Sequence, residues 1–373
     1  MKNVYLERQA ELSLKTQTLG LDAIALTPGA SLNHLAGIDY HAYERPILVL
    51  FVPNKPPIFI LPDLEAQRTA NLPYPIQVVP YHDDPATWQG AFVQASLVGE
   101  LKPNARMGVD PLHLRWLEIQ FLEGAISGLR LVDAQNSLAS LRLHKNQDEI
   151  MAMRKAVDIA QSALQRTIPS IKPGMTEKEL ASELTVNLFH QGSEVDLPFF
   201  PIVASGPNSA NPHATPSDRS LSNGDLLIID WGASYNGYLS DLTRTFCVGE
   251  ASPEAQNIAA LVLEANQAGR QTAQPGIKAH QIDDDTRSVI ARAGYGEYFI
   301  HRTGHGIGLE PHEAPYIHSN SQVILNPGMA FTVEPGIYMP GKGGVRIEDD
   351  VVITEDGADT LSTMPRELQI VGN

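Results

Sequence analysis

The sequence predicts an α+β fold in which an internally duplicated second domain follows an α/β first domain. Two segments, 224–232 and 328–336, share one spacing: a glycine begins the run, an acid follows six residues later, and a glycine follows two after that. Each segment is preceded by a Pro-Gly pair that opens a helical pattern. A chain of 373 residues is long enough for two domains. We therefore expect a pseudo-twofold repeat in the second domain.

The first part of the chain alternates between strand-like and helix-like segments. Short apolar runs bounded by Pro, Gly and Asn predict strands, and amphipathic stretches between them predict helices. The predicted strands lie in 21–29, 47–52 and 57–61, and the amphipathic stretches include 5–19 and 111–123. This alternation is typical of an α/β layer structure.

The second domain is expected to begin with a helix. Hydrophobic residues recur at helical spacing and predict one buried face; they are Ile150, Met153, Val157, Ala160 and Leu164. A second helix is expected to open at Thr176, where Glu179 completes a capping box, and Ser252-Pro253 is expected to start the corresponding helix of the second repeat. We place the domains at 1–140 and 141–373, joined within 138–146.

Five residues of metal-ligand type stand out in the second half of the sequence: Asp230, Asp241, His305, Glu334 and Glu348. Four carboxylates and one imidazole suit a pair of hard or borderline divalent cations that share bridging carboxylates. They do not suit a thiolate zinc site. Two adjacent cations can hold and activate one water, which is a recurring way to hydrolyse amides.

Two of these acids are predicted to lie together across a hairpin. Asn236-Gly237 is the strongest two-residue hairpin signal, and it would set residue 230 opposite residue 243. Asp241 would then be diagonal to Asp230 on the same face. A bound cation would remove the repulsion between the two carboxylates. Two surface aspartates beside a turn would leave the same pattern, so the hairpin alone does not decide.

Further histidines are candidates for the site. His301, His305 and His312 share a run with glycines at 304, 306 and 308, which disfavours a helix and favours an extended or looped backbone that other groups approach closely. His213 lies in a turn-rich loop, N-S-A-N-P-H-A-T-P. A lone loop histidine is usually an exposed surface residue, and that alternative stays open for His213.

These motifs resemble the pita-bread metallopeptidases, in particular the proline-specific branch of Xaa-Pro dipeptidases (prolidases) and aminopeptidases P. The likeness covers roughly 145–370 and shows no departure at any metal position. A weaker likeness to creatinase-type N-terminal domains rests chiefly on L-N-H-L-A-G-I-D at 32–39. The motifs of the main likeness are D-W-G at 230–232, S-D-L-T-R-T at 240–245, T-G-H-G-I-G-L at 303–309, H-E at 312–313, E-P-G at 334–336 and R-I-E-D at 346–349.

The resemblance implies a pita-bread catalytic fold after a creatinase-type domain, and it implies metal-binding roles. Asp230 would chelate one metal, and Asp241 and Glu348 would bridge both. His305 would bind the other metal, and Glu334 would bind a metal and handle the proton of the bridging water. Two divalent ions are expected, with manganese or cobalt favoured and zinc a further option.

The resemblance also implies roles for the other candidates. His213 and His312 would hydrogen-bond the substrate and the oxyanion, and His301 would assist near the leaving nitrogen. Arg346 would hold a substrate carboxylate, for which a guanidinium fork is well shaped.

Arg346 has a structural alternative as well. It stands two residues before Glu348, so on a strand the two share a face. A salt bridge to Glu348 or Asp349 would then be its role. Asp349, Asp350 and Arg244 are expected to be structural or solvated.

Composition narrows the partners and the compartment. A net charge of −16 at pH 7 opposes binding to nucleic acids and to anionic membranes, which need basic patches. No apolar run approaches the roughly 18 residues of a membrane span. The single cysteine, Cys247, excludes an intrachain disulfide, and the first residues show no signal-peptide pattern. We therefore expect a cytoplasmic protein.

Three functions compete. The first is hydrolysis of small peptides with proline in the second position; the short chain favours a dipeptidase over an aminopeptidase P, which takes longer peptides. The second is hydrolysis of a small non-peptide C–N bond, as in creatinase-type and ectoine-hydrolase-type enzymes. The third is a non-catalytic pita-bread binding protein. Creatinase relatives and such binding proteins lose metal ligands, whereas this chain keeps all five.

The resemblance also implies a homodimer in which a neighbouring N-terminal domain limits the pocket.

Overall fold

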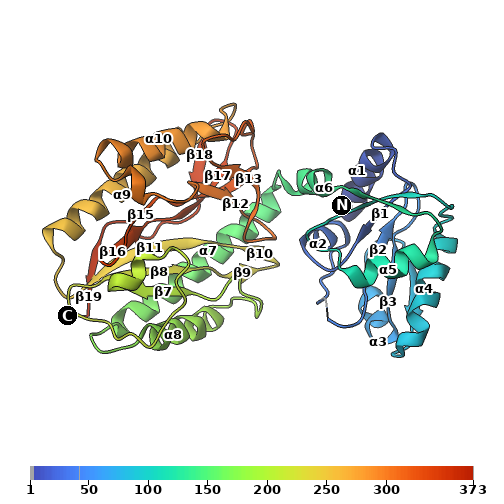
Figure 1. Ribbon diagram of the computed structural model, residues 1–373, viewed down its shortest axis with the longest axis horizontal. Coiled ribbons are helices and arrows are strands. Elements are labelled where there is room, and N and C mark those ends of the chain that lie inside the picture. The colour runs from blue at the N-terminus through green and yellow to red at the C-terminus, as the bar shows by residue number, and fades with distance from the viewer. Residues whose placement is uncertain (1–3, 42, 373) are drawn as a thin grey trace. The chain divides into compact units, whose positions relative to one another are not determined.

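The computed structural model describes residues 4–41 and 43–372, and the chain divides into two compact units, Met1–Arg142 and Leu143–Asn373 (Figure 1). Within these described ranges, no helix combines the length and the apolar character needed to cross a membrane.

The N-terminal unit is a mixed six-stranded sheet with the order β4-β3-β2-β1-β5-β6. Strand side chains point alternately to opposite faces, so each strand feeds two cores. Ile24 packs on the face that carries α1, α2 and α6, and Ala25 packs on the face that carries α4 and α5. The strands are β1 Ala23–Leu26, β2 Leu48–Phe51, β3 Ile58–Pro62, β4 Gln77–Tyr81, β5 Arg106–Val109 and β6 Arg130–Asp133. The helices are α1 Val4–Thr18, α2 Ala30–Ala36, α3 Asp63–Ala66, α4 Pro85–Val98, α5 Trp116–Ala125 and α6 Gln135–Arg142, with a 3₁₀ turn at Gln67–Thr69.

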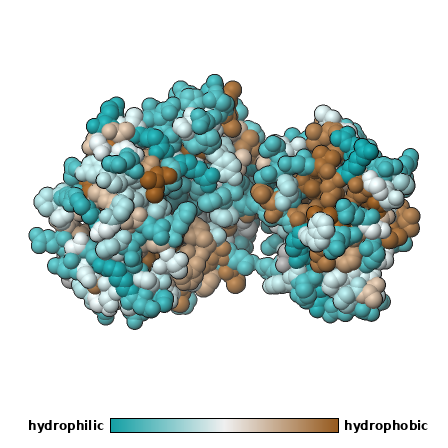
Figure 2. Space-filling view, in the orientation of Figure 1, coloured by the Kyte–Doolittle hydropathy of each residue, from teal (hydrophilic) through white to brown (hydrophobic). Residues whose placement is uncertain are grey.

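Apolar side chains reach the surface of this unit. Figure 2 shows them gathered over a broad part of the face in view. Leu14, Leu112 and Trp116 are 64%, 71% and 68% exposed. Exposed apolar groups in such numbers are typical of an interaction surface.

The C-terminal unit repeats one design twice, as the sequence predicts. Each repeat places a pair of helices outside a sheet built on a hairpin (Figure 1). The first repeat has α7 Gln147–Thr167, α8 Glu177–His190 and the sheet β19-β11-β8-β7; the second has α9 Pro253–Thr272, α10 Ala279–Arg292 and the sheet β13-β12-β14-β17-β18. Their strands are β7 Ile202–Ser205, β8 Leu226–Trp231, β11 Leu242–Val248, β19 Gln369–Val371, β12 Gly304–Gly306, β13 Glu313–Ile317, β14 Ala330–Val333, β17 Asp349–Ile353 and β18 Ala358–Thr360. Two ribbons, β9 Ser234–Tyr235 with β10 Tyr238–Leu239 and β15 Gly336–Met339 with β16 Gly343–Arg346, extend the hairpins, and 3₁₀ turns lie at Ile168–Ser170, Gly206–Ala210 and Gly296–Tyr298.

The duplication extends to backbone detail. Gly174 donates its N–H to the carbonyl of Leu221 at 2.9 Å, and Gly276 does the same to Leu325 at 2.8 Å. Both glycines adopt left-handed φ values, +89° and +87°, where a side chain would be strained. The two Pro-Gly pairs are therefore the same structural turn, used once in each repeat.

The helix starts follow the predicted signals. Thr176 and Glu179 form the capping box of α8, and Ser252 caps α9. One correspondence is corrected. The Pro-Gly turns precede α8 and α10, so α10 is the counterpart of α8 and α9 is the counterpart of α7.

The first hairpin has the predicted register. Tyr235 pairs with Tyr238 around the Asn236-Gly237 turn, and Asp230 pairs with Thr243 as expected. A two-residue turn fixes the register because every later pair follows from it. Asp241 therefore lies diagonal to Asp230.

Part of the glycine-rich segment, Gly304–Gly306, forms the short strand β12, in agreement with the extended form of the two backbone forms expected. A Cβ on Gly304 would lie 1.8 Å from the carbonyl oxygen of Thr332, and one on Gly306 would lie 2.2 Å from that of Ala314. Neighbouring backbone thus occupies the space a side chain would need. The glycines allow β12 to sit between β13 and β14.

We predict that Gly304→Ala lowers the free energy of unfolding by at least about 2 kcal/mol, because the neighbouring backbone oxygen cannot rotate away. Gly357→Ala is the matched control: its Cβ would meet nothing within 4 Å and its φ is not left-handed, so a change within about 0.5 kcal/mol is expected. Urea unfolding with a chelator present measures both without any contribution from metal. Equal midpoints for the two variants would contradict the close approach.

Candidate functional site

One pocket of about 580 Å³ in the C-terminal unit gathers every predicted site residue. Its polar lining consists of His213, Asp230, Asp241, His301, His305, His312, Glu334, Arg346 and Glu348, with Arg302 beside them. Phe199, Phe200 and Ile202 provide an apolar wall that the sequence did not predict. A concave pocket with an apolar wall and converging polar groups is the usual form of a small-molecule site.

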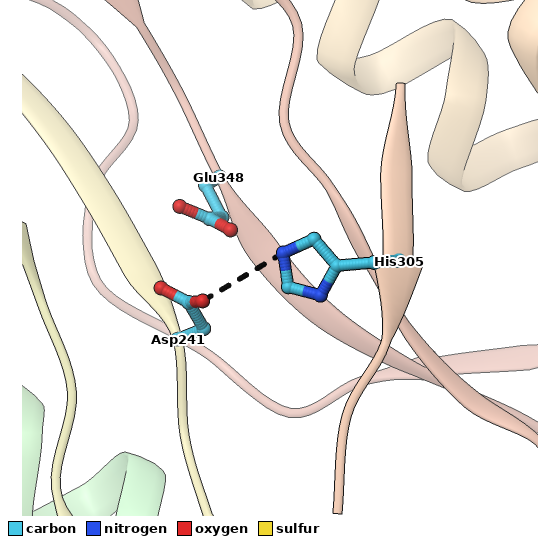
Figure 3. A group of neighbouring side chains, drawn as sticks. All are labelled: Asp241, His305 and Glu348. Carbon is cyan, nitrogen blue, oxygen red and sulfur yellow. Dashed lines mark ion pairs between the residues drawn. The ribbon is translucent and has the colours of Figure 1, made fainter. Parts of the chain in front are cut away.

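Three of the predicted ligands converge on one point. Asp241, His305 and Glu348 offer ligand atoms that all lie within 4.8 Å of one another, and all three residues are buried. Figure 3 shows the two carboxylates and the imidazole pointing toward each other from three separate segments of the chain. Asp241 precedes β11, His305 lies in β12, and Glu348 precedes β17. The two repeats therefore contribute ligands to the same cluster.

The other two predicted ligands border this cluster. Oε1 of Glu334 lies 3.3 Å from Nε2 of His305, which also lies 3.8 Å from Oδ2 of Asp241. Asp230 forms a buried ion pair with Arg346 through Oδ2. Among the described residues, its Oδ1 is buried and has no hydrogen-bond partner. An acceptor of this kind is suited to a metal ion.

The electrostatics of the cluster fit bound cations. Burial, followed by the charge of the neighbouring carboxylates, raises the pKa of Asp241 and of Glu348 well above the usual range. Burial also raises the pKa of Asp230, although Arg346 opposes it. Divalent ions would replace the lost hydration and offset the repulsion. With four oxygen donors and one imidazole, the residues fit hard or borderline divalent metals.

Neighbouring groups orient the ligands. Nδ1 of His305 lies 3.2 Å from the carbonyl of Gly306, which can only accept, so Nδ1 carries the hydrogen and Nε2 faces the acids. Thr243 donates its hydroxyl to Oε2 of Glu348 at 2.7 Å. Thr332 donates to Oε1 of Glu334 at 3.2 Å. These hydrogen bonds fix the imidazole and two of the carboxylates.

Arg346 is committed to the protein. Its Nη2 pairs with Asp230, its Nε donates to Thr243 at 3.0 Å, and its Nη1 donates to Tyr338 and to the carbonyl of Pro212 at 2.9 and 3.2 Å. The expected alternative, a salt bridge to Glu348 or Asp349, is wrong: the ion-pair partner of Arg346 is Asp230. Four of its five N–H groups are engaged, so a two-pronged grip on a substrate carboxylate would require breaking these contacts.

His301 also has protein partners on both ring nitrogens. Nδ1 lies 2.7 Å from the carbonyl of Arg302 and Nε2 lies 2.9 Å from the hydroxyl of Tyr338. Since a carbonyl only accepts, Nε2 is the acceptor and Tyr338 donates to it. Burial lowers the pKa of His301, in agreement with a neutral ring. Tyr338 thereby links His301 to Arg346, and a direct contact of His301 with a leaving nitrogen would replace one of these bonds.

His312 and His213 also line the pocket. Among the described residues, their ring nitrogens have no hydrogen-bond partners of the kind that hold His301. Burial, followed by the charges of His305 and Arg302, lowers the pKa of His312 to about 4, so its ring is neutral at pH 7. The ring centroid of His312 lies 4.0 Å from that of His305. His213 lines the same pocket from an exposed loop. Its position matches a pocket role better than that of an unrelated surface residue.

Asp349, Asp350 and Arg244 are structural. All three are buried, so the solvated alternative does not hold. Burial opposes ionisation of Asp349, but Arg244 and Arg366 outweigh it and lower the pKa of Asp349 far below the usual range. Asp350 accepts the backbone N–H of Asp241 at 3.1 Å. These residues support the strands that carry the ligands.

Hairpin register shows which acids correspond between the repeats. Val333 pairs with Asp349 and Gly336 pairs with Arg346, so Glu334 faces Glu348 just as Asp230 faces Thr243. Glu348 is therefore the counterpart of Thr243. Asp241 and Glu348 therefore do not occupy equivalent places in the two repeats.

Asp241 has a different counterpart in the second repeat. It faces Gly232, because the pair of Ser234 with Leu239 and the pair of Trp231 with Leu242 belong to one continuous register. In the second repeat the residue that faces the equivalent glycine, Gly336, is Arg346. One repeat thus places an anion where the other places a cation.

Several site residues carried no local signal. Tyr338 and Thr243 act through contacts with residues distant in sequence, and Arg302 is one arginine among many. Phe199-Phe200 beside Pro201 is the one feature that could have been noticed, as an apolar pair in a loop-like stretch near the acids.

Comparison with known proteins places this geometry in a family. Residues 151–355 match the model of metallopeptidase family M24, and residues 8–144 match the creatinase/prolidase N-terminal domain. A probable dipeptidase, PepE, of Mycobacterium tuberculosis is 38% identical, over 99% of this chain and 97% of its own.

Solved structures give the same result. A recombinant prolidase from Thermococcus sibiricus superposes with a TM-score of 0.93 at 34% identity, covering 100% of both chains. An X-Pro aminopeptidase from Thermotoga maritima superposes with a TM-score of 0.84 at 30% identity, covering 96% of this chain and 100% of its own.

We predict that Asp241→Asn and Glu348→Gln each remove at least one metal ion per chain and abolish hydrolysis, because each deletes an anion from the cluster. Elemental analysis and a peptide assay measure the two effects. With a chelator present, both variants should unfold at least as late in urea as the wild type, since a buried repulsion has been removed.

Asp218→Asn is the control for these variants, because the Asp218 side chain is 85% exposed and its loss should leave metal content unchanged. Full metal content together with full activity in Asp241→Asn or Glu348→Gln would contradict the assignment of these two ligands.

Proposed function

The chain belongs to metallopeptidase family M24, with a creatinase-type domain before its pita-bread catalytic domain, and on that premise we propose that it hydrolyses Xaa-Pro dipeptides with two divalent metal ions. The observation that carries the proposal is the convergence of acids and imidazoles from both repeats in one pocket. Relatives named dipeptidase and prolidase over nearly the whole chain support the substrate class.

Five residues would hold the ions: Asp230, Asp241, His305, Glu334 and Glu348. When bound, two divalent cations lower the pKa of a shared water and polarise the scissile carbonyl. His305 offers Nε2 because Nδ1–H is directed to Gly306. Thr243 occupies Oε2 of Glu348 and thereby sets the direction of the other oxygen.

Glu334 is suited to accept a proton. Burial opposes its ionisation, but the neighbouring His305, His301 and Arg346 outweigh burial and lower the pKa of Glu334 to about 2. The carboxylate is therefore ionised at pH 7, beside the place where the ligands converge. In the proposed reaction it takes a proton from the attacking water and passes it to the leaving nitrogen.

Two imidazoles at the pocket are suited to donate hydrogen bonds. His312 keeps one N–H at neutral pH because its pKa is about 4. His213 lines the same pocket. Donors aimed at the developing oxyanion stabilise the transition state, and we propose this role for both residues.

Arg302 is better placed than Arg346 to bind the substrate carboxylate. It is the other arginine of the pocket lining, and its guanidinium lies 4.6 Å from the ring centre of Tyr316. Among the described residues, no group forms a hydrogen bond or an ion pair with the guanidinium of Arg302. We therefore propose that Arg302 binds the terminal carboxylate, and that Arg346 holds Asp230 in place.

An aminopeptidase that takes longer peptides is the second candidate. The similarity to the X-Pro aminopeptidase of Thermotoga maritima supports it. A free arginine at the pocket favours the dipeptidase, since only a dipeptide places its carboxylate directly after the proline. Retention of all five ligand residues disfavours the creatinase-type and non-catalytic alternatives.

Manganese or cobalt and a homodimer complete the proposal. Four carboxylates with one imidazole support the choice of metal. The exposed apolar side chains of the N-terminal unit support self-association. Elemental analysis and sedimentation velocity test the two points; zinc alone, or a monomer at micromolar concentration, would count against them.

We predict that Ala-Pro is hydrolysed faster than Ala-Pro-amide and Ala-Pro-Ala, with kcat/KM at least about tenfold lower for the amide, because one charge-assisted contact is lost. Ala-Ala should be a poor substrate. Liberated amino acid, assayed on one metal-loaded preparation, gives all four rates. Equal rates on the three proline peptides would favour the aminopeptidase, and no hydrolysis of any would refute the proposed function.

Arg302→Gln should raise KM for Ala-Pro about tenfold or more and leave KM for Ala-Pro-amide nearly unchanged, because the amide lacks the charge that Arg302 would bind. Metal content should be that of the wild type. A loss of the same factor on both peptides would assign Arg302 a general structural role instead.

A further inference from the structure

The loop that carries His213 is held by hydrogen bonds at both ends and in its middle. Between Ser205, where β7 ends, and Ser217, the backbone forms one 3₁₀ turn and no strand. His213 is exposed in this loop, and its backbone N–H donates to the Asn211 side chain at 3.2 Å. The position of the imidazole in the pocket therefore depends on how the loop backbone is held.

A single buried carboxylate holds both ends of the loop. Oε1 of Glu177 accepts the backbone N–H and the hydroxyl of Ser205, both at 2.7 Å. Oε2 accepts the backbone N–H and the hydroxyl of Ser217 at 3.0 and 2.6 Å. Nδ2 of Asn208, within the loop, lies 3.2 and 3.1 Å from the two oxygens.

Contacts with β16 hold the middle of the loop. Gly344 donates its N–H to the hydroxyl of Ser209 at 2.8 Å. Arg346 donates to the carbonyl of Pro212, the residue before His213, at 3.2 Å. The loop is thus fixed between Glu177 on one side and the strand that ends at Arg346 on the other.

The chemistry at Glu177 requires a carboxylate. The side chain is fully buried at the first position of α8, and every group around its oxygens is a donor. Burial opposes ionisation, but the hydrogen bonds of Ser217 and Ser205 outweigh it and lower the pKa of Glu177. Glutamine has one oxygen, so in either orientation its NH₂ group would face a backbone N–H at one end of the loop.

We propose that Glu177 is a positioning residue for peptide hydrolysis, which holds the 205–217 loop so that His213 reaches the substrate. The inference rests on the proposed function and deepens it. Glu177 does not line the pocket, so it acts through His213. A small displacement of a catalytic donor is enough to lower the rate strongly.

A double-mutant cycle on Ala-Pro hydrolysis tests the proposal. Glu177→Gln should lower kcat/KM about tenfold in the wild type, mainly through kcat, and less than twofold in the His213→Ala background. Metal content should be unchanged in all four proteins. Equal factors in both backgrounds, or wild-type kinetics in folded Glu177→Gln, would overturn the proposal.

Hydrogen exchange provides a readout that does not require activity. Amides of the 205–217 segment should exchange at least about tenfold faster in Glu177→Gln than in the wild type. Unchanged exchange would overturn the proposal whether or not the protein hydrolyses Xaa-Pro peptides. If the wild type does not hydrolyse Xaa-Pro peptides but the 205–217 amides exchange faster in Glu177→Gln, the proposed function and the role of Glu177 in hydrolysis are both refuted. Only the conclusion that Glu177 holds the loop would then stand.

Glu118→Gln is the matched control. Glu118 is also a fully buried glutamate, it pairs with Arg115, and it belongs to the N-terminal unit. This variant should leave kcat/KM and exchange in 205–217 unchanged. If Glu177→Gln does not fold, Ser217→Ala removes one donor to the same carboxylate and should shift both readouts in the same direction by a smaller factor; no shift in either would overturn the proposal.

Discussion

The repulsion among four carboxylates in one pocket, three of them buried, is the constraint on which the catalytic unit depends. Asp230, Asp241, Glu334 and Glu348 line one pocket, and the pKa values of Asp241 and Glu348 are raised by burial and by their acidic neighbours. The protein offsets part of this repulsion itself, through the ion pair of Arg346 with Asp230. Divalent cations would offset the remainder. Thr243 and Thr332 then serve to orient carboxylates that would otherwise turn away from one another.

The duplicated fold explains how so many acids meet, and its departures from symmetry explain how they are tolerated. Each hairpin directs an acid of one strand to the same region, and Glu334 and Glu348 also face each other within the second hairpin. At the place of Glu348 the first repeat has Thr243, and at the place of Asp241 the second repeat has Arg346. Strict symmetry would give either too much negative charge or too few ligands. The site works as an unequal pair of similar halves.

Local sequence patterns predicted those features of the fold that depend on contacts between residues close in sequence. The Asn236-Gly237 turn fixed the pairing of Asp230 with Thr243, and the glycines of 304–308 indicated an extended or looped backbone in place of a helix. The partner of Arg346 could not be predicted, because Asp230 lies 116 residues away and the pair exists only after the repeats have packed. The hydrogen bonds of Glu177 to the 205–217 loop could not be predicted for the same reason, because the sequence around Glu177 indicates only the start of a helix. Motif resemblance supplied the list of ligand residues, but it gave no information on which supporting groups hold them.

The distribution of the ligands along the chain has a consequence for the life of the protein in the cell. Asp230 and Asp241 leave the ribosome long before His305, Glu334 and Glu348, so a growing chain carries two of the five ligand residues before the other three. The complete set of ligands therefore exists only in the finished unit, and a metal ion would bind firmly only there. Because binding to the native chain alone lowers the population of unfolded chains, the supply of metal would set the resistance of the protein to degradation. Metal scarcity would reduce the amount of the protein as well as its activity.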